Sequence, residues 1–81
     1  MIKEITKKLG ERGLQKFQAA ASKGIVGGQG QSGIKRIVGV TIRGISYLYE
    51  IKVLGEFGGY RIFGYLNDVG TIIFDYFGKH L

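Results

Sequence analysis

Residues 47–77 constrain the fold more than any other part of the chain, because they hold three short runs rich in β-branched and aromatic residues. Two turn-like segments, 55–59 and 67–70, separate these runs and contain glycine, asparagine and aspartate. The chain has no proline, so every residue in the runs can donate its backbone N–H to a neighbouring strand. This pattern predicts a three-stranded antiparallel meander.

The lengths of the two turns predict how the strands pair. Pairing Val53 with Tyr60 closes the first hairpin with a six-residue loop, and pairing Leu66 with Thr71 closes the second with a four-residue loop. Side chains alternate between the two faces of a strand, so this register brings three polar side chains into one row on one face. The row consists of Lys52, Arg61 and Tyr76.

The two faces of the expected sheet differ in composition. The face of the polar row also carries one acidic and five apolar or aromatic side chains: Glu50, Leu48, Phe63, Tyr65, Ile72 and Phe74. The opposite face is more uniformly apolar and carries Tyr47, Tyr49, Ile51, Val53, Tyr60, Ile62, Leu66, Ile73 and Phe77. A register slip of one residue in one hairpin would separate the members of the polar row.

Residues 1–23 predict a helical segment, because their apolar residues follow the spacing of one helix face. Gly10 and Gly13 each cost about 1 kcal/mol in a helix interior. We therefore expect a break there, with a second helix over about residues 14–22. Half of residues 24–33 are glycine, which predicts a loop.

A glycine motif in this loop has the form G-x-G-x-x-G at residues 28–33. A dinucleotide site also needs a preceding strand, a helix and a later acidic residue, so we interpret the motif as part of a flexible connector. Val38, Val40 and Ile42 alternate along residues 34–43 and predict another strand. Together these segments predict one α+β domain, residues 1–81, in which one or two helices pack on a four-stranded antiparallel meander over residues 34–81.

Charge and composition narrow the class of partner. The formal net charge is +6, and the excess of Lys and Arg lies in residues 1–36, whereas residues 37–81 are neutral overall. This distribution favours a polyanion or an acidic protein as partner. The chain has no cysteine, no apolar run long enough to span a membrane and no signal-peptide core, so we expect a cytoplasmic protein that does not bind membranes.

Familiar catalytic patterns are missing from the sequence. The only histidine is His80, no metal-ligand spacing occurs, and no serine lies in a nucleophile elbow, so we expect neither a metal nor a cofactor. The row of Lys52, Arg61 and Tyr76 then has two interpretations. It is either a set of cross-strand ion pairs beside Glu50, or a site that cleaves RNA without metal, where cations and a tyrosine share proton transfer and phosphate stabilisation.

Three segments resemble the C-terminal half of RelE/ParE superfamily toxins, closest to the phage-derived HigB-like branch. They read YLYEIKV, GGYRIFGYL and NDVGTIIFDYFGKH. In that family a strand ending in a basic residue precedes a G-x-Y-R-hydrophobic strand, and the last strand runs into a basic tail. The resemblance covers about residues 34–81.

The resemblance implies a RelE-like fold and a type II toxin that cleaves mRNA, usually on the ribosome, under the control of a cognate antitoxin. It implies catalytic roles for four residues and substrate contacts for two. Lys52 or Tyr76 would act as base, Arg61 would stabilise the phosphate, His80 or Lys79 would act as acid or phosphate contact, and Arg43 would join them. Two alternatives remain open: a non-catalytic basic module that binds nucleic acid or protein, and a gyrase-inhibiting ParE-like toxin.

Overall fold

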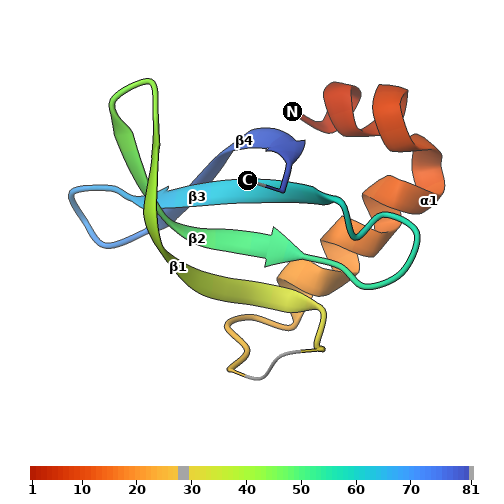
Figure 1. The fold of residues 1–81 in the computed structure, drawn as a ribbon, viewed down its shortest axis with the longest axis horizontal. Coiled ribbons are helices and arrows are strands. Elements are labelled where there is room, and N and C mark those ends of the chain that lie inside the picture. Colours follow the sequence, from red (N-terminus) through yellow and green to blue (C-terminus); the bar gives the residue numbers. More distant parts are fainter. Residues whose placement is uncertain (28–29, 81) are drawn as a thin grey trace.

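The computed structural model describes residues 1–27 and 30–80. Its elements are α1 (Ile2–Ser22), β1 (Gly33–Ile42), β2 (Ile45–Lys52), β3 (Tyr60–Leu66) and β4 (Ile72–Lys79). The strands form one antiparallel sheet in the order β1-β2-β3-β4, and α1 lies against one side of it (Figure 1). The expected α+β fold, helical at its N-terminus with a four-stranded meander after it, is confirmed.

Helix α1 is broken where the glycines predict a break. Gly10 has φ 75° and ψ −177°, which lies far outside the helical region and joins two helical halves across a kink. Gly13, in contrast, is buried inside the second half, so that half begins earlier than residue 14. A Cβ at Gly13 would lie 2.2 Å from the Cβ of Leu9, so the glycine allows the two halves to approach closely.

The helix packs on the more apolar face of the sheet, as the alternation predicts. The buried side chains at this interface are Ile5, Phe17 and Ala20 of α1 with Ile51, Val53 and Ile62 of the sheet region. Phe17 also meets Phe77 edge to face, with ring centroids 6.2 Å apart. Each large apolar side chain buried here contributes about 1.5–3 kcal/mol to stability.

The predicted register of β2 and β3 is confirmed. Glu50 lies opposite Phe63 and Ile51 opposite Ile62, which is the pairing that follows from setting Val53 against Tyr60. The six-residue loop between Val53 and Tyr60 is therefore correct as well.

The predicted register of β3 and β4 is wrong. Leu66 lies opposite Ile72, not Thr71, because the Asn67 side chain accepts hydrogen bonds from two N–H groups of the loop and thereby holds a five-residue turn. A bulge next to Asp75 then adds a second shift, so Tyr76 lies opposite Phe63, not opposite Arg61. Tyr76 is thus displaced by two residues along β4 from the place beside Arg61 that the predicted polar row required.

The one-residue shift at the Asn67 turn moves two apolar side chains to the helix side of the sheet. Phe74 and Ile72, expected on the face of the polar row, both lie over Gly64, where a Cβ would be 2.7 Å from the Phe74 ring and 2.9 Å from Ile72. Only glycine leaves the space that these two side chains occupy.

The other face of the sheet, which carries Glu50, Arg61 and Phe63, is curved, and we call it the concave face. The β1–β2 hairpin bends at a bulge between Arg36 and Val40 and turns toward β4 (Figure 1). This bend brings the Tyr47 ring to 6.1 Å from Phe63, so Tyr47 belongs to the concave face and not to the opposite face where we expected it. Tyr47 and Phe63 are both 1% exposed.

The glycine-rich segment pairs with the sheet at its beginning. The N–H of Val26 donates to the carbonyl of Ile34, and the N–H of Ile34 donates to the carbonyl of Gly24, which makes a short parallel bridge beside β1. This pairing covers the first part of the β1 edge. Two residues of the glycine motif, Gly28 and Gln29, lie outside the described residues.

Substituting Gly64 tests the close packing under the β4 bulge. We expect Gly64→Ala to lower the free energy of unfolding by about 1–3 kcal/mol, because the new Cβ forces Phe74 and Ile72 to move. Gly59→Ala is the matched control, since a Cβ there meets nothing within 4 Å. Urea unfolding of both variants checks the prediction; equal stabilities would contradict the packing described here.

Candidate functional site

Arg61 and Glu50 form a buried ion pair between the two central strands. Arg61 Nε donates to Glu50 Oε2 at 3.1 Å, and the two side chains are 7% and 12% exposed. The structural interpretation of the polar row is confirmed for Arg61. Its charge is balanced by Glu50 before any substrate arrives.

The same guanidinium also fastens the loop between β2 and β3. Arg61 Nη1 donates to the carbonyl oxygens of Gly58 and Tyr60, the latter at 2.9 Å. These bonds connect β2, β3 and the loop through one side chain. Arg61 is therefore first of all a structural residue.

Lys52 lies beside this ion pair. The register of β2 and β3, extended by one pair, sets Lys52 opposite Arg61 and on the same face as Glu50. Lys52 is half-buried. Its side chain is therefore partly accessible to solvent.

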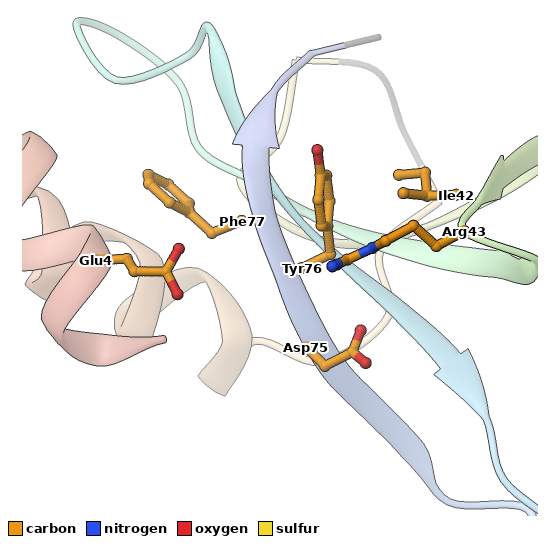
Figure 2. A pocket seen from close by; sticks show the side chains of 6 residues that line it. All are labelled: Glu4, Ile42, Arg43, Asp75, Tyr76 and Phe77. Carbon is orange, nitrogen blue, oxygen red and sulfur yellow. The ribbon is translucent and has the colours of Figure 1, made fainter.

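The register separates Tyr76 from Arg61 by two residues along β4, but the direction of the Tyr76 ring brings its hydroxyl group back toward Arg61. The ring is directed along β4 toward the C-terminal end of the strand (Figure 2). A Cβ at Gly78 would lie 3.1 Å from this ring and 3.5 Å from its hydroxyl oxygen, so the ring lies over Gly78. Since Gly78 is opposite Arg61, the phenol reaches the end of the sheet where Lys52 also lies.

His80 follows at the same end, whereas Lys79 does not. The N–H of His80 donates to the carbonyl of Gly59 at 2.8 Å, which continues the pairing beyond β4. By alternation His80 shares the concave face with Tyr76, and Lys79 lies on the helix side. The register thus places Lys52, Tyr76 and His80 on the same face as the buried Arg61, and Lys79 on the other face.

Arg43 reaches the concave face from the tip of the β1–β2 hairpin. The turn consists of Arg43 and Gly44, with φ 51° and 80°. The Arg43 guanidinium lies 5.6 Å from the centre of the Tyr76 ring, a cation–π contact. Arg43 is exposed, so its charge remains accessible to solvent.

A pocket of about 510 Å³ opens beside this contact, along the outer side of β4. Its lining residues are Glu4, Ile42, Arg43, Asp75, Tyr76 and Phe77 (Figure 2). Glu4 and Phe77 stand on the helix side of β4, and Arg43 and Tyr76 stand on the concave side. The pocket therefore combines both signs of charge with two aromatic rings.

Tyr47 and Asp75 form a contact that was not predicted from the sequence. Tyr47 Oη donates to Asp75 Oδ1 at 2.6 Å and joins β2 to β4 across the concave face. Burial, this hydrogen bond and the charge of Asp75 raise the pKa of Tyr47 to about 12, against a smaller opposing effect of Arg43. The one feature of the sequence that indicated this contact and the bulge is the aspartate inside an otherwise apolar strand.

No group of three metal-binding side chains comes together within residues 1–27 and 30–80. No helix in the same part of the chain is long and apolar enough to cross a membrane.

The Glu50–Arg61 pair gives a double-mutant prediction. Arg61→Met leaves Glu50 buried without a cation, so we expect the free energy of unfolding to fall by about 3–5 kcal/mol. Replacing both residues by methionine removes the unpaired charge, and the double variant should be more stable than the single one. Denaturant unfolding measures both; a double variant no more stable than Arg61→Met would argue against a buried pair.

Tyr47 gives a prediction at alkaline pH. Because folding raises the pKa of Tyr47 from 10 to about 12, its contribution to stability is complete below pH 10 and is lost as the pH rises from 10 to 12. We expect Tyr47→Phe to show a shallower decline of stability over this window than the unaltered protein. Unfolding at several pH values checks this, with Tyr49→Phe as the control for general alkaline effects; identical slopes for all three proteins would refute it.

In comparisons with known proteins, no family model, no curated protein and no solved structure matches the chain.

Proposed function

We propose that the chain is the toxin of a type II toxin–antitoxin system and cleaves mRNA without a metal ion in the cytoplasm, on the ribosome. One observation carries this proposal. The Tyr76 phenol lies over Gly78, at the end of the concave face that also holds Lys52 and His80. These three groups, together with Arg43, supply the proton-transfer and cationic functions that the reaction requires.

The reaction has a defined proton balance. A base takes the proton of a ribose 2′-hydroxyl, whose oxygen attacks the adjacent phosphorus. The bond from phosphorus to the 5′ oxygen breaks, an acid protonates that oxygen, and a 2′,3′-cyclic phosphate remains. Lys52 or Tyr76 serves as base, and His80 serves as acid from the edge of the same face.

Arg61 has a changed role in this proposal. Its ion pair with Glu50 and its bonds to loop carbonyls occupy Nε and Nη1. Arg61 therefore holds the site in position and is not the main contact of the phosphate. Arg43 and Lys52, which are more exposed, take over most of the attraction for the phosphate. Loss of activity in an Arg61 variant would therefore report on folding as much as on catalysis.

Removing the Tyr76 hydroxyl tests the proposal most directly. Tyr76→Phe keeps the ring contacts with Phe63 and Arg43 but removes the proton-transferring group, so we expect RNA cleavage to slow by about 10²–10⁴-fold. Tyr65→Phe is the matched control, since Tyr65 also contacts Tyr47 on this side of the sheet but is not assigned to the reaction. Cleavage of mRNA during translation in vitro is followed by primer extension.

A cleavage rate of Tyr76→Phe equal to that of Tyr65→Phe would remove the assigned role. Growth that continues unchanged when the protein is expressed would remove the toxin proposal itself.

A non-catalytic RNA-binding module is the second candidate, and the buried Glu50–Arg61 pair favours it. The exposed lysines of α1, Lys3, Lys7, Lys8 and Lys16, would then provide the electrostatic contacts. Such binding weakens steeply with salt and does not change in Tyr76→Phe. Salt titrations of RNA binding with this variant separate the two candidates.

A further inference from the structure

The outer edge of β4 is a strand edge beside the pocket described above. Within residues 1–27 and 30–80, β3 is the one strand that pairs with β4, on its other side. The N–H of His80 donates toward β3, and hydrogen-bonding residues alternate in an antiparallel pair, so Gly78 and Tyr76 also face β3. Phe77 and Lys79 therefore direct their N–H and C=O groups outward.

These groups lie on the side of β4 that faces away from β3, at the end of the strand order. The first half of α1 stands across the pocket from this edge, with Glu4 in the pocket lining (Figure 2). An open edge of this kind is a template for the backbone of another extended chain.

The other edge of the sheet is less suitable for the same purpose. The segment around Val26 already pairs with Ile34 at the start of β1. Farther along, a bulge that includes Gly39, with φ 75°, interrupts the regular backbone of β1. The outer edge of β4 from Tyr76 to Lys79 is regular by comparison.

The charges at the pocket indicate which kind of chain fits. Glu4 and Asp75 place two carboxylates at the edge of a protein whose net charge is +6, and the Glu4 side chain is 72% exposed. Carboxylates repel the phosphates of a nucleic acid and attract basic side chains. Arg43, on the concave side, attracts an acidic one.

We propose that the outer edge of β4 binds an extended peptide segment of a partner protein as a fifth strand. The backbone groups of Phe77 and Lys79 pair with the segment, Glu4 contacts a basic side chain, and Arg43 contacts an acidic one. Neighbouring residues of a strand point to opposite faces, so one segment can satisfy both charges. This inference goes beyond RNA cleavage and does not depend on it.

Amide hydrogen exchange with a synthetic probe tests the proposal. The probe is the acetylated, amidated heptapeptide Thr-Lys-Val-Lys-Glu-Val-Thr. Its neighbouring lysine and glutamate point to opposite faces of a strand, as contacts with Glu4 and Arg43 require. In the free protein the amides of Phe77 and Lys79 exchange fast because they face away from β3; with peptide bound their exchange slows. The amides around Val38, on the other edge, stay unchanged.

Two pairs of variants identify the contacts. Lys79→Pro removes an outward N–H without removing a bond to β3, and we expect it to weaken peptide binding about threefold to tenfold relative to Lys79→Ala, the scale of one backbone hydrogen bond. Glu4→Lys reverses a charge at the pocket and weakens binding about fivefold relative to Glu11→Lys, whose carboxylate does not line it.

Three results would overturn the proposal. They are exchange at Phe77 and Lys79 that stays fast at millimolar peptide, slowed exchange on β1 alone, and an RNA decamer that slows these amides where the peptide does not. None of these measurements uses RNA cleavage, so the proposed activity and the peptide site can fail separately.

Discussion

The Glu50–Arg61 ion pair is the interaction on which the arrangement of the sheet depends. It joins the two central strands under the concave face, and the remaining donors of Arg61 hold the loop between them. A charge pair buried to this extent stabilises little on its own, because desolvation offsets most of the attraction. Its effect is on specificity: other registers of β2 and β3 would leave one charge buried without its partner. The site around Lys52 and Tyr76 is built on this fixed register.

The sequence predicted the parts of the fold that depend on local rules. Alternation and turn length gave the register of β2 and β3 correctly, and glycine propensity gave the break at Gly10. The second hairpin was predicted wrongly, because the Asn67 side chain lengthens the turn and the bulge at Asp75 adds another residue. Both effects arise from single side chains and tertiary contacts, which the period of a strand does not encode.

The candidate site was predictable only as a set of residues on one face. Its geometry depends on Gly78, whose missing side chain lets the Tyr76 ring lie back toward Arg61. Tyr47 was assigned to the opposite face, since alternation assumes a strand that does not bend. The position of Tyr47 on the concave face follows from the curvature of the β1–β2 hairpin. A pattern of alternation along single strands contains no information about curvature.

The bend of the β1–β2 hairpin also has a consequence for the order of folding. Every pair of adjacent strands in this sheet is consecutive along the chain, so each can form as a local hairpin with a low cost in loop entropy. The Tyr47–Asp75 bond spans 28 residues and requires β2, β3 and β4 to be in place first. This contact of the concave face is thus completed only after the hairpins that it connects have formed.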